Sequence, residues 1–324
     1  MHAEKSVLLP ITTDEAFALI TEPERLRRWK TVSARVDLRA GGEYRFTIAP
    51  GNVAAGTYTV VEPGKRLVFG WGWEGSPDLP PDASTVTITI EPVEGGTLVR
   101  LVHDGLTVEQ AASHLQGWSH FFDRLERAAA SGDAGPDEWS ATPADLNPLS
   151  SADATLAVCQ HVLRGLSGDD LGHVIPASKL TVGQLAQHLV DSLVGLGVAA
   201  GGQMVGGSSG TVESQVASVG QQAVEAWTRR GLDGSVRLAA GAMPAEVAAS
   251  LLSVELLVHA WDVAAATGRR LTVSDDLNRY VLELAQHVIT PFVQAGGSFA
   301  SAAATGPDAD ILERLIEFSA RAAA

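Results

Sequence analysis

LVHDGLTVEQAASHLQGWSHFFDRLE, residues 101–126, ends a strand-like run and begins a long helix. Thr107 and Gln110 have the spacing of a capping box, which predicts the start of that helix. From Thr107 to Ala130 the apolar residues recur at helical spacing. One stripe of this helix carries Leu115, Trp118, Phe122 and Leu125. The stretch therefore predicts a long amphipathic helix that covers the strands before it.

Strand-like runs with turn residues between them precede this helix. They cover residues 33–38, 42–48, 55–62, 66–73, 84–91 and 96–103. TVTITIEP (85–92) alternates strictly, so one face of that strand should be buried and the other wet. A strand at 5–10 and two short helices, TTDEAFALI and PERLRRW, come first. This order indicates an α+β fold for the N-terminal half.

The composition of the chain changes near residue 131. SGDAGPDEWSATPADLNPLSS (131–151) is rich in Gly, Pro, Ser and Asp and reads as a linker. After it, apolar residues recur at helical spacing, which predicts helices at about 152–166, 181–200, 211–231, 244–267 and 275–292. We therefore predict a domain at 1–130, a linker at 131–151 and a helical bundle at 152–324.

Charge and cysteine content narrow the function classes. The 324 residues include 23 Lys and Arg against 38 Asp and Glu, a net charge of -15, which does not suit nucleic acid or an anionic membrane surface. Cys159 is the single cysteine, so neither an internal disulfide nor an all-thiolate metal site can form. The first residues show no long apolar segment of the secretory type. We expect a cytoplasmic protein.

The N-terminal pattern resembles the START/Bet v superfamily, also called SRPBCC, over residues 3–130. The segments that carry the resemblance are LPITTDEAFALITEPERLRRW, AGGEYRF, GTYTVVEPGKRLVFGWGW and the stretch at 101–126. They look like the branch named after activators of the heat-shock-protein ATPase. The resemblance implies a helix-grip fold, with a curved antiparallel sheet around the long helix and a cavity for a small apolar ligand between them. Trp71, Trp73, Trp118 and Phe122 would line that cavity or, alternatively, form ordinary core.

SVELLVHAWDVAAATG (253–268) contains the residues best suited to chemistry. Glu255 and His259 are four apart, so they lie on one face of a helix, within its predicted core stripe. A carboxylate in an apolar interior is costly without a partner, and a cation is the simplest compensation. His188, in TVGQLAQHLVD, flanks the apolar side of another helix and is the best candidate for a third ligand. Two histidines and a glutamate would leave positions open on Zn²⁺, as catalytic sites do.

This spacing taken alone also fits an ordinary hydrogen-bonded pair, Glu255 to His259. The combination of TVGQLAQHL with VELLVHAWDVAAATG resembles the DinB/YfiT-like superfamily over about 152–320, and within it the branch around mycothiol-dependent maleylpyruvate isomerase. The resemblance implies a four-helix bundle in which His188, Glu255 and His259 bind a divalent metal, usually zinc. It also implies that Asp262 orients a ligand or holds the helix end.

Two function classes follow from these features. One is a metal-dependent enzyme, a thiol transferase, isomerase or hydrolase with mycothiol as the cosubstrate that the resemblance implies, and with an N-terminal domain that holds an apolar ligand. The other is a small-molecule-binding or stress-response protein whose metal site is structural or vestigial. The sequence names neither the substrate nor the oligomeric state, and a homodimer stays open.

Overall fold

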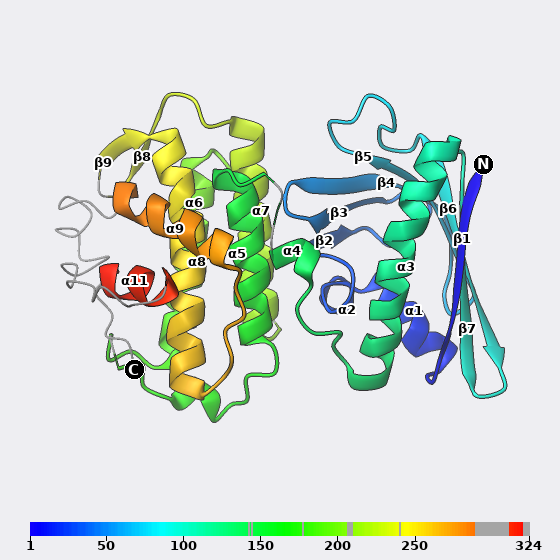
Figure 1. Cartoon of the computed structure of the whole chain (residues 1–324), viewed down its shortest axis with the longest axis horizontal. Helices are drawn as coiled ribbons and strands as arrows, with labels where there is room; N and C mark the ends of the chain where they lie inside the picture. Colours follow the sequence, from blue (N-terminus) through cyan, green and yellow to red (C-terminus); the bar gives the residue numbers. More distant parts are fainter. Residues whose placement is uncertain are drawn as a thin grey trace. The chain divides into compact units, whose positions relative to one another are not determined.

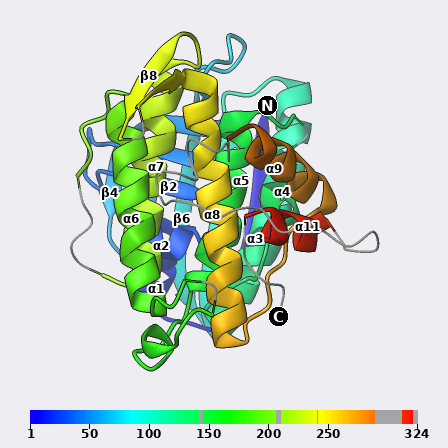
Figure 2. The same cartoon turned by 90° about the vertical axis from the view of Figure 1, so that its left-hand side faces the viewer.

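The protein is described by a computed structural model that covers residues 1–141, 143, 145–176, 178–205, 210–239, 241–288 and 311–319. The chain forms two compact units, Met1–Asp137 and Glu138–Ala324. Their helices and strands are drawn in Figure 1 and, turned by 90°, in Figure 2.

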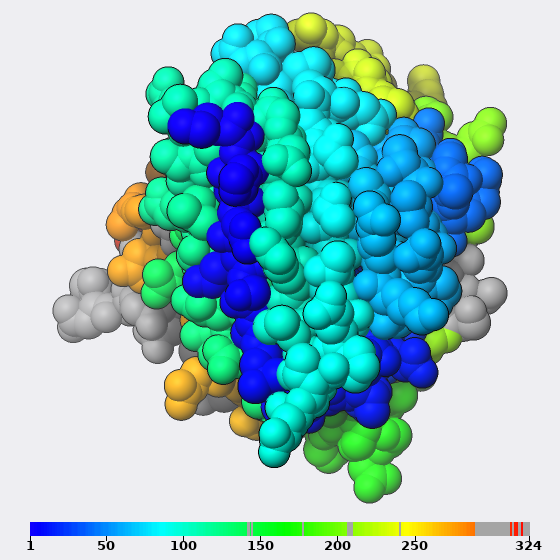
Figure 3. Space-filling model, turned by 90° about the vertical axis from the view of Figure 1, so that its right-hand side faces the viewer, coloured from blue at the N-terminus to red at the C-terminus, as the bar shows by residue number. Residues whose placement is uncertain are grey.

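The first unit is a seven-stranded antiparallel sheet with helices, as Figure 1 shows. The strands follow the order β1-β7-β6-β5-β4-β3-β2, so the first strand lies beside the last, as the blue and cyan surfaces in Figure 3 show. The elements are β1 (His2–Leu9), α1 (Thr13–Thr21), α2 (Pro23–Leu26), β2 (Ser33–Val36), β3 (Glu43–Ala49), β4 (Asn52–Glu62), β5 (Arg66–Trp73), β6 (Ser84–Val93), β7 (Gly96–Asp104) and α3 (Val108–Ser131).

Helix α3 begins where the sequence predicts, because Thr107 and Gln110 form the expected capping box. It buries Trp118, Phe122 and Leu125 in one core with the inner face of the sheet. Leu115 is an exception: it is exposed, at the margin of the buried stripe. Strand β6 alternates as predicted, with its even-numbered residues from 84 to 90 buried. These features fit a helix-grip domain.

The stretch predicted as a linker carries structure at both of its ends. Arg124 donates hydrogen bonds to the carbonyls of Gly135 and Pro136, and Asp137 lies 3.0 Å from His120 Nε2, so residues up to 137 are held by the first unit. Helix α4 covers Glu138–Ala141. Helix α5 (Pro148–Leu163) begins four residues before the predicted 152, because Asn147 caps it with bonds from the amides of residues 149 and 150.

The second unit is built around four helices that share one hydrophobic core and lie alongside one another in Figure 2. They are α5, α6 (Val182–Ala199), α7 (Val212–Arg230) and α8 (Ala245–Thr267). Helix α6 starts with the predicted capping box of Thr181 and Gln184. Among the described residues the unit also contains the short 3₁₀ turn η1 (Asp170–Gly172), α9 (Asp275–Val288) and α11 (Ile311–Phe318). The predicted helix at 275–292 extends outside the described residues beyond 288.

Helix α8 is the central element of this unit and is apolar on nearly all sides. Among the described residues it is the one helix whose length and composition would suit a membrane, and 89% of its apolar window is buried inside the protein. A helix that is hydrophobic all round belongs in the core of a protein or in a membrane. The burial of α8 accounts for its composition here.

The expectation of an all-helical second half missed a small hairpin. Strands β8 (Ser235–Leu238) and β9 (Gly241–Pro244) form a two-stranded antiparallel sheet before α8. Each strand is four residues long, too short for a period-two pattern to be distinguished from a loop. The hairpin ends at Pro244, which occupies the cap position of α8.

Candidate functional site

Three side chains with metal-binding atoms converge in the second unit. Helix α6 supplies His188, and α8 supplies Glu255 and His259. One ligand atom from each lies within 4.8 Å of the other two, and they form the one such cluster found among the described residues. Glu255 Oε2 lies 3.2 Å from His259 Nε2 and 3.9 Å from His188 Nε2. The structure thus brings together all three residues that the sequence singles out.

Burial within this cluster is graded. Glu255 and His259 are buried at 7% and 5% exposure, whereas the side chain of His188 is 48% exposed. The two imidazole rings lie edge to face, with their centroids 5.3 Å apart. A site whose outermost ligand is half exposed can be reached by a solute, which a structural site closed by four buried ligands does not allow.

Asp262 contacts the nitrogen of the His259 ring that faces away from Glu255. Its Oδ2 lies 3.1 Å from His259 Nδ1, and Asp262 is 1% exposed. If Nδ1 carries the proton that this carboxylate accepts, the lone pair of Nε2 points toward Glu255 Oε2. Two acceptors then face each other at 3.2 Å, a contact that a proton shared between them or a cation between them would make favourable.

The separations are close to those of a metal site. Ligand atoms about 2.0–2.2 Å from a tetrahedral zinc ion are about 3.4 Å apart. The two contacts of Glu255, at 3.2 and 3.9 Å, lie on either side of that value. Rotation of the half-exposed His188 side chain can shorten the 3.9 Å distance between its Nε2 and Glu255 Oε2. The contact between Glu255 and His259 also suits a charged helix pair, so the position of His188 on a separate helix is what favours a metal.

A second polar cluster, in the first unit, was not found from the sequence. Trp118 Nε1 donates to His103 Nδ1 at 3.2 Å, so the proton of His103 is on Nε2 and is donated to Ser84 Oγ, 2.9 Å away. Ser84 in turn donates to the carbonyl of Trp71. Burial, with smaller contributions from His114 and Lys30, lowers the pKa of His103 to about 3. This serine and histidine are therefore a neutral structural network rather than a nucleophile and its base.

The predicted cavity between α3 and the sheet is present but small. Its volume is about 10 Å³, enough for about one water molecule. Trp118 and Phe122 are among the side chains that line it. Trp71 lies in the surrounding core, and the half-buried Trp73 donates to His114 Nε2 at 3.3 Å; neither belongs to the lining. In this arrangement the cavity has no room for a whole apolar ligand.

Lys30 is the functional candidate that the sequence analysis missed. It follows α2 and is 5% exposed, with its ammonium inside the aromatic core and on the wall of this cavity. Basic residues are common at positions 25–28, and nothing in the sequence marks the one that points inward. The only signal is the neighbouring Trp29, whose side chain is also buried.

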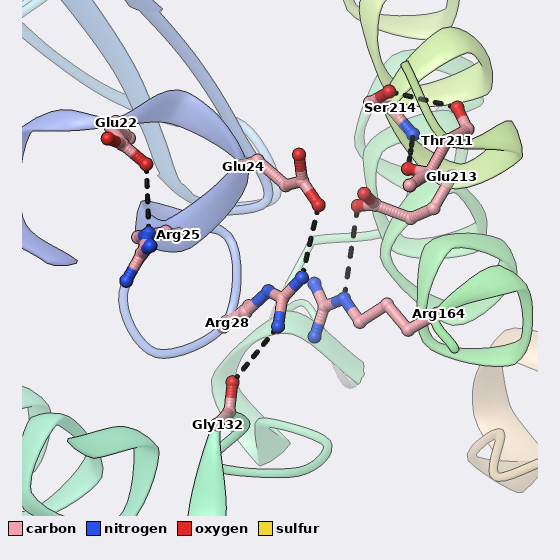
Figure 4. Close-up of polar contacts among 9 residues, drawn as sticks. All are labelled: Glu22, Glu24, Arg25, Arg28, Gly132, Arg164, Thr211, Glu213 and Ser214. Carbon is pink, nitrogen blue, oxygen red and sulfur yellow. Dashed lines mark hydrogen bonds and ion pairs between the residues drawn. The ribbon is translucent and has the colours of Figure 1, made fainter. Parts of the chain in front are cut away.

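The first unit has a larger hollow of about 390 Å³ between α1, α2 and the end of α3. Two of its three glutamates pair with its two arginines, as Figure 4 shows. Arg25 lies 2.8 Å from Glu22, and Arg28 lies 3.1 Å from Glu24 and donates to the carbonyl of Gly132. In the second unit the same figure shows Glu213, which is buried, 3.8 Å from Arg164. Each of these three arginines therefore has an acidic partner.

Comparison with known proteins places the first unit in a family. Residues 10–130 match the family described as Activator of Hsp90 ATPase homolog 1-like protein. The solution structure of the AHSA1-like protein RHE_CH02687 from Rhizobium etli is 36% identical and covers 45% of this chain and 92% of that one, with a TM-score of 0.38. The Aha1 dimer from Colwellia psychrerythraea is 18% identical over 41% of this chain and 98% of its own, with a TM-score of 0.37.

A curated relative is also found. The uncharacterized protein Rv0738 of Mycobacterium tuberculosis is 25% identical over 154 residues, which is 47% of this chain and 85% of that protein. The predicted likeness of the second unit to the DinB/YfiT superfamily is not tested by these matches and stays a prediction. The match at residues 10–130 confirms the predicted branch for the first unit: the N-terminal half of the chain belongs to the AHSA1-like family of the SRPBCC fold.

Proposed function

We propose that the chain is a divalent-metal-binding protein whose second unit holds the metal on His188, Glu255 and His259. The observation that carries this proposal is the convergence of three ligand atoms from two helices within 4.8 Å. One carboxylate oxygen and two imidazole nitrogens form a donor set that suits zinc. Asp262, 3.1 Å from His259 Nδ1, would fix the ring so that Nε2 is the ligand atom.

We further propose a reaction class, a thiol-dependent transfer, isomerisation or hydrolysis. A bound zinc ion lowers the pKa of a coordinated thiol or water and polarises a carbonyl. The thiol has to come from outside the chain, because burial raises the pKa of Cys159 to about 12 and keeps it protonated. Mycothiol is the cosubstrate that the DinB-like resemblance implies. The half-exposed His188 lies on the side from which substrate and thiol would arrive.

The second candidate is a binding protein without catalysis. It is favoured by the first unit, where an AHSA1-like domain encloses a cavity between α3 and the sheet. In this alternative the first unit binds an apolar small molecule and the cluster in the second unit is structural or vestigial. A cytoplasmic location and a homodimer are compatible with both candidates and belong to the proposal.

Elemental analysis of protein purified without a polyhistidine tag tests the metal site. We expect about one divalent metal ion per chain, lost in His259→Ala and in Glu255→Gln. His287→Ala is the matched control, because His287 is an exposed histidine whose Nδ1 bonds to the carbonyl of Glu283 within α9. If the variant lacking all three ligands retains the metal content of the wild type, the site is wrongly assigned.

Turnover then separates the two candidates. Metal-loaded protein, given a low-molecular-weight thiol and an electrophilic test substrate such as maleylpyruvate, should show turnover that a chelator abolishes. Turnover that survives complete metal removal contradicts the enzyme proposal. Full metal occupancy without turnover on thiol-dependent substrates supports the structural alternative.

A further inference from the structure

The ammonium of Lys30 is enclosed by aromatic rings. Its Nζ lies 4.8 Å from the ring centroid of Trp118, 4.9 Å from Phe46, 5.1 Å from Trp71 and 5.9 Å from Trp29. Ring faces at these distances attract a cation, and more strongly where water is excluded. The rings give Lys30 a defined place but no hydrogen-bond acceptor.

No charge balances this ammonium within the described part of the chain: no ion pair of Lys30 is found there. His103 on β7 is near enough to Lys30 for their charges to interact, and burial lowers its pKa to about 3, so it stays neutral. Burial also lowers the pKa of Lys30 to about 7. An isolated buried cation is costly, and proteins usually pair it or remove it.

Tyr58 on β4, which lines the same cavity, also carries a polar group without a partner. Its hydroxyl is buried without a hydrogen-bond partner, and both Tyr58 and Lys30 line the 10 Å³ cavity. Burial raises the pKa of Tyr58, so the hydroxyl keeps its proton and remains a donor. The two indole N–H groups in the lining are already used, Trp29 by the carbonyl of Leu19 and Trp118 by His103. The cavity therefore has two unused donors and an otherwise apolar wall.

We propose that Lys30 and Tyr58 form the head-group site for the carboxylate of an apolar acid bound between α3 and the sheet. This inference rests on the proposal that the first unit binds an apolar ligand, and it adds that the ligand is a carboxylic acid. A carboxylate supplies the negative charge that Lys30 lacks and the acceptor that Tyr58 lacks. A neutral apolar molecule supplies neither.

The size of the cavity sets the way in which such an acid binds. A volume of about 10 Å³ fits one head-group oxygen, in the place that a water molecule would take. The hydrocarbon part has to displace lining side chains such as Trp118 and Phe122 on α3. Because Trp29, Trp71 and Trp118 surround the ammonium, binding has to change tryptophan fluorescence.

The test compares decanoate with decanol on the full-length protein, by tryptophan fluorescence and by calorimetry at pH 6. Wild type should bind decanoate at least about tenfold more tightly than decanol. The free energy of one charge-assisted hydrogen bond in a buried site corresponds to an affinity ratio of about that size. Lys30→Met should remove this preference, and Tyr58→Phe should reduce it. The control is Lys65→Met, which removes an exposed lysine in the turn after β4 and should leave binding unchanged.

The outcomes separate this inference from the proposal on which it rests. Equal affinity for the two probes, unaffected by Lys30→Met, overturns the head-group site and leaves apolar binding intact. Failure of both probes to bind overturns both. If Lys30→Met fails to fold, Tyr58→Phe decides, because it removes one oxygen and no charge: an undiminished preference for decanoate in that variant contradicts the assignment.

Discussion

His259 Nδ1 lies 3.1 Å from Asp262 Oδ2, and the two residues are buried on α8, three positions apart. This contact fixes the ring so that its other nitrogen points at Glu255. A carboxylate that holds the far nitrogen of a histidine is the usual support of a metal ligand. In the proposed metal site Asp262 would be a positioning residue, and its effect on metal affinity can be measured separately from that of the proposed ligands.

Asp262→Asn should weaken metal binding by about 10–100-fold without abolishing it, because the amide no longer holds the proton on Nδ1 as a carboxylate does. Glu255→Gln should be more severe, because it removes a ligand charge. A competition titration with a chromophoric zinc chelator measures both. Equal affinity of Asp262→Asn and wild type would contradict the orienting role.

Metal occupancy should fall as the pH is lowered, because protons compete with the metal for His188 and His259. Thiol-dependent turnover should fall in parallel with metal content. Metal analysis after dialysis across a pH series, with turnover measured on the same samples, checks this. The control is His287→Ala, which should follow the wild-type curve.

Lys30→Met should change how stability depends on pH. The pKa of Lys30 is about 7 in the folded chain and 10.5 in its ordinary state, so between these values the unfolded chain binds more protons. The free energy of unfolding contributed by Lys30 therefore rises with pH across that window, and its full penalty applies below pH 7. In Lys30→Met this rise should disappear, and the variant should be more stable than wild type at pH 6. Denaturant unfolding of both proteins at pH 6, 8 and 10 measures the difference. If the free energy of unfolding varies with pH in the same way in Lys30→Met and wild type, Lys30 titrates as an exposed lysine does.

Trp118→Phe should destabilise the first unit by about 1–3 kcal/mol, because it leaves buried His103 Nδ1 without its donor. Trp227→Phe in the second unit is the comparison, since the buried Trp227 Nε1 has no partner to lose. Denaturant unfolding followed by circular dichroism reports both. A smaller loss for Trp118→Phe than for Trp227→Phe would argue against the network.

The two units should fold separately, as the change in composition near residue 131 suggests. A chain of residues 1–137 should melt cooperatively and at a higher temperature than residues 1–130. The shorter chain loses the carbonyls of Gly135 and Pro136 that Arg124 binds, and leaves part of a buried guanidinium unpaired. Calorimetry of the three chains 1–130, 1–137 and 138–324 tests this. Absence of a transition in both 1–137 and 138–324 would contradict it.

The sequence by itself determined the elements whose signals are local. Capping boxes at Thr107 and Thr181 mark helix starts because a side chain and an amide three residues away must meet. Alternation in β6 predicts its buried face because side chains point to opposite sides of a strand. Glu255 and His259 could be paired from sequence because four residues make one helical turn.

The tertiary structure alone decided which groups from distant elements meet. His188 is 67 residues before Glu255, and only the packing of α6 on α8 brings their ligand atoms within 4.8 Å. The same holds for Ser84 with His103, and for Lys30, whose cage comes from β3, β5, α3 and the segment after α2. A lysine in a run of basic residues has no periodicity that distinguishes inside from outside. Its burial depends on where the aromatic rings of other elements lie, and that is a property of the folded chain.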